Sequence, residues 1–135
     1  MKIQRFEDLD CWKEARKLMQ SIYRLTKKDV FNKDYRLKDQ ITGAGISILN
    51  NIAEGFDSQS NNEFIRFLQI SRRSVSEVET CLYIALDQCY INTSEFDDAF
   101  AQSEKVKQVI DGFLRYLRLY KRTKTKLTNQ TKLTN

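Results

Sequence analysis

Lysine and arginine side chains recur at helical spacing near both ends of the chain, a pattern suited to binding phosphates. Near the C-terminus Arg115, Arg118 and Arg122 are three and four residues apart, so one helix would present them together. Cations arranged in this way neutralise nucleic-acid phosphates and release counterions, whatever the base sequence. The candidate nucleic-acid-binding residues are Lys13, Lys17, Arg24, Arg115, Arg118, Lys121, Arg122 and Lys124.

The charge distribution favours the C-terminal group. All 18 acidic residues precede Lys121, with Asp111 the last of them, so the net charge of +5 belongs to residues 121–135. The alternative is ordinary helix chemistry, because cations in a last helical turn complement the helix dipole. Surface ion pairs at helical spacing would then be Glu63–Arg66, Arg73–Glu77 and Asp111–Arg115.

Catalytic chemistry has little support in the composition. The chain contains no histidine, which removes the commonest general base and any Ser/His or Cys/His pair. Carboxylates such as Glu54, Glu77 and Glu79 could bind a hard cation, but no loop has a recognisable ligand spacing. We therefore expect no catalytic residue, no metal site and no cofactor, and a protein that is not an enzyme.

Four amphipathic segments would position these side chains. Ser60 and Glu63 have the spacing of a capping box, and Ser94 is the expected cap of the last helix. The chain has no proline and four glycines, which favours long helices over a sheet. We predict an all-α domain over residues 1–120, an antiparallel up-down-up-down four-helix bundle, followed by a basic, disordered tail over 121–135. The expected helices are 8–27, 34–54, 61–89 and 94–120, with a loop at 29–33.

The second predicted helix is more apolar than one core contact requires. Its core stripe is expected to be Leu37, Ile41, Ala44, Ile48 and Ile52. A second stripe, Ile46, Leu49 and Ala53, is rotated by about 120° and is predicted to be a subunit interface. The alternative is a helix sunk deep in the core of a monomer.

The expected location is the cytoplasm. The N-terminus has no apolar run suited to a signal peptide, and no window approaches the ~20 apolar residues of a membrane span. Cys11, Cys81 and Cys89 are odd in number and are expected to stay reduced. Membrane association is not expected, because the basic faces oppose core stripes rather than exposed aromatic ones.

Several short motifs, in this order along the chain, resemble one bacterial family. They are Phe6-Glu7-Asp8-Leu9, Trp12, Ile22-Tyr23-x-Leu25-Thr26, Asp39-Gln40-Ile41, Ser47-Ile48, Asn51-Ile52-Ala53-Glu54-Gly55, Glu63-Phe64-x-Arg66-Phe67-Leu68, Glu77-x-Glu79-Thr80 and Tyr90-Ile91. The sequence is similar to the four-helix bundle proteins encoded in intervening sequences of large-subunit ribosomal RNA genes. That family includes the accessory variability determinants of diversity-generating retroelements.

The resemblance implies a bundle that assembles into a ring, typically a homopentamer. In the retroelement branch it also implies binding to a reverse transcriptase and its template RNA. This chain departs from the family pattern at Thr42-Gly43, where relatives carry a basic pair, and at Leu49, where relatives carry proline. It also departs at Arg72-Arg73, where relatives carry a basic and a small residue, and Arg73 and the basic tail could compensate for the missing pair. The resemblance therefore implies assembly more directly than RNA binding.

Together these features predict a non-catalytic accessory or scaffold protein that forms a ring-like homo-oligomer and contacts RNA or DNA phosphates through its basic surfaces. The alternative is a protein–protein interaction scaffold, such as a reverse-transcriptase accessory subunit, that does not touch nucleic acid. Salt-dependent RNA binding would favour the first, and a partner retained at high salt after nuclease treatment would favour the second.

Overall fold

The computed structural model describes the backbone of residues 3–134 and the side chains of residues 3–120. Within that range all regular structure is helical and there is no strand, so the prediction of an all-α fold is confirmed. The elements are the 3₁₀ helix η1 (Phe6–Asp8) and the helices α1 (Asp10–Thr26), α2 (Asp29–Lys33), α3 (Tyr35–Asp57), α4 (Asn61–Asp87) and α5 (Thr93–Thr134).

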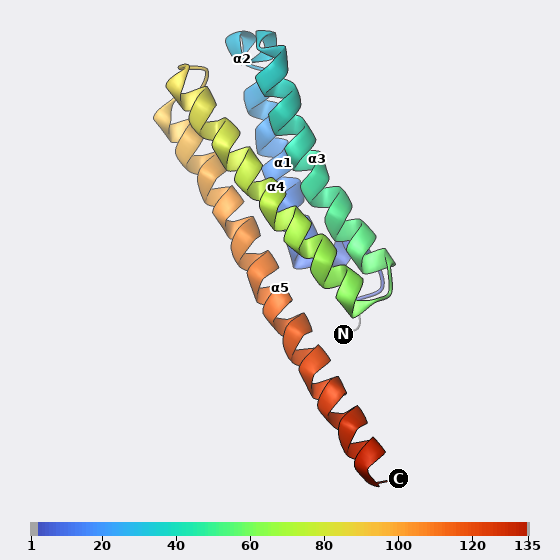
Figure 1. Ribbon diagram of the computed structural model, residues 1–135. Coiled ribbons are helices and arrows are strands. Elements are labelled where there is room, and N and C mark those ends of the chain that lie inside the picture. Colours follow the sequence, from blue (N-terminus) through green and yellow to red (C-terminus); the bar gives the residue numbers. More distant parts are fainter. Residues whose placement is uncertain (1–2, 135) are drawn as a thin grey trace.

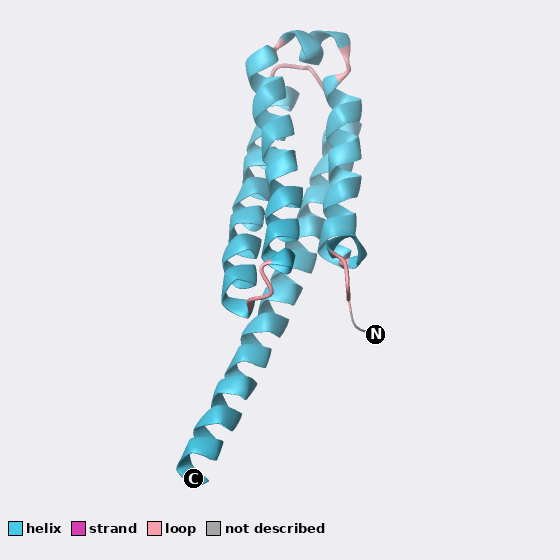
Figure 2. Cartoon of the chain, turned by 90° about the vertical axis from the view of Figure 1, so that its right-hand side faces the viewer, coloured by secondary structure: helices cyan, strands magenta, loops and turns pink. Residues whose placement is uncertain are grey.

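The four long helices lie side by side (Figures 1 and 2). Helix α1 contacts α3, α3 contacts α4, α4 contacts α5, and α5 returns to contact α1. The short helix α2 and the α4–α5 turn lie at one end, and the α3–α4 turn lies at the other (Figure 1). The apolar core lies between these helices, and the predicted α3 stripe is confirmed as part of it. Its five members, Leu37, Ile41, Ala44, Ile48 and Ile52, are all buried.

The segment 29–33 is a helix and not the predicted loop. It contains one aromatic residue, Phe31, whose side chain is completely buried, whereas the neighbouring Val30 is exposed. The Phe31 ring lies 5.5 Å from the ring of Tyr90, which follows α4. The segment folds because the Phe31 side chain covers one end of the core. It was not predicted as a helix because five residues are too few to show a helical period in the sequence.

The cap at Ser60 forms as predicted, but only in part. The Ser60 hydroxyl accepts a hydrogen bond from the Glu63 amide at 3.3 Å. A complete capping box would also have the Ser60 amide donate to the Glu63 carboxylate. That amide donates to the Ser58 hydroxyl instead, at 3.3 Å. The Glu63 carboxylate instead binds Arg66.

Helix α5 begins one residue before the predicted cap. The side chain of Asn92 accepts from the Glu95 amide at 2.8 Å, and the Glu95 carboxylate accepts from the Asn92 amide at 2.9 Å. This reciprocal pair is a complete capping box, so Asn92 caps the helix and the prediction of Ser94 was wrong.

At its other end α5 continues to Thr134, beyond the expected end near Tyr120. Residues 121–134 contain neither proline nor glycine, so no residue in them interrupts a helix. Side chains beyond Tyr120 lie outside the described residues, and the prediction of a disordered tail over 121–135 stays a prediction.

Two further expectations concern membranes and thiols. Among the described residues no helix combines the length and apolarity needed to cross a bilayer. All three cysteines are free, with Cys11 and Cys81 buried and Cys89 exposed.

Candidate nucleic-acid interface

A groove of about 500 Å³ runs between α4 and α5 and collects arginines from both helices. Arg72 and Arg73 line it from α4 and Arg118 lines it from α5. The remaining lining residues are Gln69, Asp111 and Leu114, the last of which is buried. The two helices therefore bring together arginines that are more than forty positions apart in the sequence.

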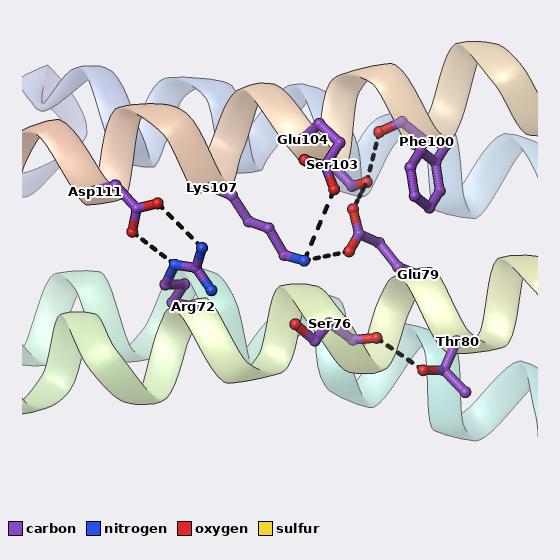
Figure 3. A network of polar contacts seen from close by, with 9 residues as sticks. All are labelled: Arg72, Ser76, Glu79, Thr80, Phe100, Ser103, Glu104, Lys107 and Asp111. Carbon is purple, nitrogen blue, oxygen red and sulfur yellow. Dashed lines mark hydrogen bonds and ion pairs between the residues drawn. The ribbon is translucent and has the colours of Figure 1, made fainter.

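Arg72 is held in this groove by Asp111 (Figure 3). Its Nε donates to Asp111 Oδ1 at 2.6 Å and its Nη2 donates to Oδ2 at 3.1 Å. This bidentate contact is the main reason why the pKa of Arg72 lies above its ordinary value. The predicted pair of Asp111 with Arg115 does not form.

The other arginines of this region are left without an acidic partner. Neither Arg73, Arg115 nor Arg118 makes an ion pair with any described residue. The predicted pair of Arg73 with Glu77 is absent, whereas the pair of Arg66 with Glu63 forms at 3.0 Å. The groove and its edge therefore carry an excess of positive charge that the protomer does not neutralise.

A polar network that begins one turn before Asp111 on α5 holds the two helices in register (Figure 3). Lys107 Nζ donates to Glu79, and Ser103 Oγ lies 2.7 Å from Glu79 Oε2 and 2.6 Å from the Phe100 carbonyl oxygen. Glu79 is a buried carboxylate at 7% exposure. Burial acts to raise its pKa, but hydrogen bonds from neighbouring groups, including Lys107 and Ser103, outweigh it and hold the pKa below its ordinary value.

Glu104 completes the network from the solvent side. Its Oε1 lies 3.8 Å from Lys107 Nζ. Hydrogen bonding with Glu79 is the main cause that raises the pKa of Glu104. No buried side-chain nitrogen or oxygen among the described residues lacks a partner, so this network is satisfied and stabilises the α4–α5 contact.

The predicted basic residues of α1 form a separate surface. Lys13, Lys17 and Arg24 are all exposed, and Lys17 Nζ lies 3.2 Å from Glu14 Oε1 on the same helix. Helix α5 contacts α1 through Gln102, whose side chain donates a hydrogen bond to the Glu14 carbonyl oxygen. At 100° per residue, Gln102 and Arg118 are about 160° apart around the axis of α5. The α1 lysines and the groove therefore lie on different sides of the molecule.

The remaining predicted binding residues divide as follows. Arg115 and Arg118 are exposed on α5, and Arg118 lines the groove. Lys121, Arg122 and Lys124 lie outside the residues whose side chains the structure describes. The predicted binding residues did not include Gln69, Arg72, Arg73 or Asp111, although the adjacent Arg72-Arg73 pair is a departure from the family pattern that could supply positive charge in place of the missing basic pair.

The predicted interface residues occupy the outer face of α3. Ile46 is 44% exposed, and Leu49 and Ala53 are half-buried. No charged residue occurs from Gln40 to Ala53, so this whole face is uncharged. An uncharged, partly apolar helix face suits packing against another protein surface better than contact with water.

Gly43 on the same helix has no packing role within the protomer. A Cβ atom added at Gly43 would meet nothing within 4 Å. By contrast, a Cβ at Gly55 would lie 2.9 Å from Phe64 Cδ1 and 2.9 Å from Phe67 Cβ. Gly55 is therefore explained by close helix packing, whereas Gly43 weakens α3 by about 1 kcal/mol without any such contact.

Comparisons with known proteins place this geometry in context. The model of one family, the 23S rRNA-intervening sequence protein family, matches residues 7–112. A crystal structure of a protein of unknown function from the S23 ribosomal protein family of Bacteroides thetaiotaomicron superimposes with a TM-score of 0.72 at 24% identity. That match covers 77% of this chain and 97% of the other, and it shows a shared fold. No curated protein matches the sequence.

Proposed function

The chain belongs to the 23S rRNA-intervening sequence protein family, and we propose that it is a non-catalytic, nucleic-acid-associated scaffold of the cytoplasm. In this proposal the four long helices form an antiparallel up-down-up-down bundle. Copies of it assemble into a ring of five, in keeping with the family resemblance, through the α3 face around Ile46, Leu49 and Ala53. RNA or DNA phosphates bind the α4–α5 groove.

The observation that carries the proposal is the pair of unneutralised arginines, Arg73 and Arg118, on opposite walls of one groove. Asp111 is the last acid of the chain and is already bound to Arg72, so nothing beyond it on α5 can neutralise Arg115 or Arg118. The basic residues Lys121, Arg122 and Lys124 continue the same helix in sequence. A phosphate backbone supplies the negative charge that this region lacks.

A second candidate function rests on the uncharged α3 face. If that face binds a different protein, such as a reverse transcriptase, the chain is an interaction scaffold and the basic end of α5 is a solubilising extension. The two functions differ in their salt dependence, because phosphate contacts weaken steeply with salt and an apolar contact does not.

The test is equilibrium binding of a fluorescent RNA strand and a matched DNA strand between about 50 and 200 mM salt. We expect R73A/R118A to weaken binding at least about tenfold at the lower salt and to reduce the salt slope by about two. Removal of residues 121–135 should weaken binding further. The matched control is K13A/K17A, which removes the same charge from α1 and should leave affinity nearly unchanged.

Three results would count against the groove. Absence of binding to both strands at low salt would reject nucleic-acid contact altogether. Equal losses of affinity in R73A/R118A and K13A/K17A would show that binding depends on the net charge of the protein and not on the groove. Co-purification of a protein partner at high salt after nuclease treatment would favour the second function.

A further inference from the structure

A second groove, with a volume of about 460 Å³, lies between α3 and α4. Leu37 and Cys81 form its buried floor, and both are only 7% exposed. Ile84 also lines the groove and is 43% exposed. The other lining residues are polar, namely Asp34, Arg36, Gln40, Glu77 and Thr80. An apolar centre with a polar rim is the usual anatomy of a contact between two proteins.

Three charged side chains line the groove, and one of them is already bound within the protomer. Asp34 Oδ1 accepts a hydrogen bond from the Leu37 amide at 3.0 Å, and Asp34 Oδ2 accepts from the Tyr90 hydroxyl at 2.9 Å. Neither Arg36 nor Glu77 forms an ion pair with any described residue. The rim therefore carries one cation and one anion that the protomer does not neutralise.

Arg36 and Glu77 lie on different helices and at different heights. Ser47 Oγ on α3 lies 2.9 Å from Ser74 Oγ on α4, which relates the heights of the two helices. Arg36 is eleven residues from Ser47, whereas Glu77 is three residues from Ser74. Both counts lead toward the end of the bundle where α2 lies (Figure 1). The two charges are therefore separated along the helices by eight residues, or about 12 Å.

Ile84 lies at a third corner of the groove. It is ten residues beyond Ser74, so it is at nearly the same height as Arg36 but on the other helix. Arg36 and Glu77 thus occupy one diagonal of the groove, and the exposed apolar side chain of Ile84 begins the other diagonal.

A patch with this arrangement is complementary in charge to itself. In an isologous contact a residue i meets residue j of the second copy, and j meets i in return. A two-fold axis along the diagonal that starts at Ile84 would bring Arg36 of each copy to Glu77 of the other. The same axis would bring the two Ile84 side chains together over the apolar floors, with the two bundles crossing each other.

We propose that the α3–α4 groove is an isologous contact between two copies of this chain. Two Arg36–Glu77 ion pairs form across its rim, and the paired Ile84 side chains cover its apolar floor. Because the contact is limited to one groove and its rim, we expect a dissociation constant on the order of micromolar.

This contact goes beyond the proposed function and does not depend on it. The proposed nucleic-acid site uses Arg73 and Arg118 in the α4–α5 groove, and the proposed ring uses the α3 face around Ile46. Because the three sites have no residue in common, each of the three proposals can fail without the others.

The test is self-association of the full chain without nucleic acid, measured by sedimentation equilibrium from about 1 to 100 μM. Ile46→Asp is introduced first, to remove the proposed ring contact and leave the groove contact alone. This I46D chain should form a dimer. In the same background R36E and E77R should each weaken dimerisation at least about tenfold, because each replaces two ion pairs by two contacts between like charges.

Two further sets of variants check the apolar part of the contact and the integrity of the fold. I84D should also weaken dimerisation, because it places a carboxylate against its symmetry mate. R24E and D98R make the same changes of charge at exposed positions on α1 and α5, and they should leave the dimer unchanged. All of these variants should keep the helical circular dichroism of the I46D chain.

Mixing the two single variants identifies the partner residue. In the I46D background, R36E presents only anions at the two rim positions and E77R presents only cations. An equal mixture should therefore form heterodimers with about the affinity of the I46D chain, and R36E/E77R should dimerise with itself. Any other pairing of the surfaces would leave the mixture unrecovered.

Three results would overturn the groove contact. They are a monomeric I46D chain at about 100 μM, an unchanged affinity in R36E or E77R, and a failure of their mixture to recover. A dimer in the I46D chain and also in the wild type would support the groove contact and count against the ring.

Discussion

Arg72 of α4 and Asp111 of α5 are joined by two hydrogen bonds, 2.6 Å and 3.1 Å long, across the floor of the basic groove (Figure 3). The pair connects helices whose contributing residues are 39 positions apart in the chain. It uses the last acid of the sequence, and so it leaves Arg115 and Arg118 on the same helix without an acidic neighbour farther along. One structural ion pair thus determines which arginines stay available for a ligand.

Asp111→Asn should increase nucleic-acid affinity. The substitution removes one negative charge from the groove and frees the guanidinium of Arg72 for a phosphate. Because both side chains are more than a third exposed, the loss in unfolding free energy should stay within about 1 kcal/mol. The measurement is strand binding at several salt concentrations, together with urea denaturation.

Asp39→Asn is the control for that experiment. Asp39 is exposed on α3, so the control makes the same change in net charge away from the groove. An affinity gain that is equal in both variants, or absent from Asp111→Asn, would argue against phosphate contact at the groove.

Lys107→Met should destabilise the protein by about 3 kcal/mol at pH 7, because it leaves the buried Glu79 carboxylate without its cation. In the wild type the folded-state pKa of Glu79 is lowered, so its contribution is present above the unfolded value of about 4.3 and is lost as the pH falls through the folded value. Without Lys107 the burial effect should dominate and raise that pKa. The difference between variant and wild type should therefore shrink from pH 7 to about pH 4.

Urea denaturation at the two pH values measures this difference. The double variant Glu79→Gln with Lys107→Met is the control, and it should recover most of the stability at pH 7 because no buried charge remains. A deficit in Lys107→Met that is independent of pH would show that the loss comes from packing and not from Glu79.

Gly43→Ala should stabilise the isolated protomer by about 1 kcal/mol and weaken its assembly. Alanine favours the helix, and the added methyl group meets nothing within 4 Å in the protomer. If a neighbouring copy packs closely on the α3 face, the same methyl group separates the two surfaces. Thermal denaturation at low concentration and sedimentation at high concentration measure the two effects.

Gly55→Ala provides the contrast, because its Cβ would lie 2.9 Å from Phe64 and Phe67. That variant should lose about 1–3 kcal/mol through overpacking within the protomer. Unchanged assembly in Gly43→Ala would remove this part of α3 from the proposed interface.

Cys89→Gly should stabilise the protein by about 0.5–1 kcal/mol. Cys89 follows α4 with a φ of 61°, a left-handed conformation that glycine adopts without strain. The Cys89 amide donates to the Leu86 carbonyl at 3.0 Å, and the Tyr90 amide donates to the Ala85 carbonyl at 2.9 Å. These two bonds form a Schellman motif, in which glycine is the preferred residue at this position.

Cys89→Ala is the matched control, since it removes the exposed thiol but keeps the Cβ atom. It should leave the melting temperature nearly unchanged while Cys89→Gly raises it. Equal melting temperatures for the two variants would mean that the positive φ carries no cost at this turn.

The sequence predicted the features of this protein that depend on nearby residues. The buried stripe from Leu37 to Ile52 was predicted correctly, because helical periodicity is a local property that each segment carries. The hydroxyl cap at Ser60 was predicted for the same reason. The helix at 29–33 was missed, since its two apolar residues, Val30 and Phe31, are adjacent and show no helical period. Phe31 is buried by contacts with distant residues.

Only the tertiary structure decided how the charges pair. From the sequence, Asp111 suited Arg115 four residues later, but the folded chain places it beside Arg72 on another helix. Ion pairing between helices depends on their rotation and axial register, which the packing of the whole core sets. The sequence by itself therefore determined the long helices, their buried faces and the basic end of the chain. The tertiary structure determined the groove, because only packed helices decide which arginines are neutralised and which remain free.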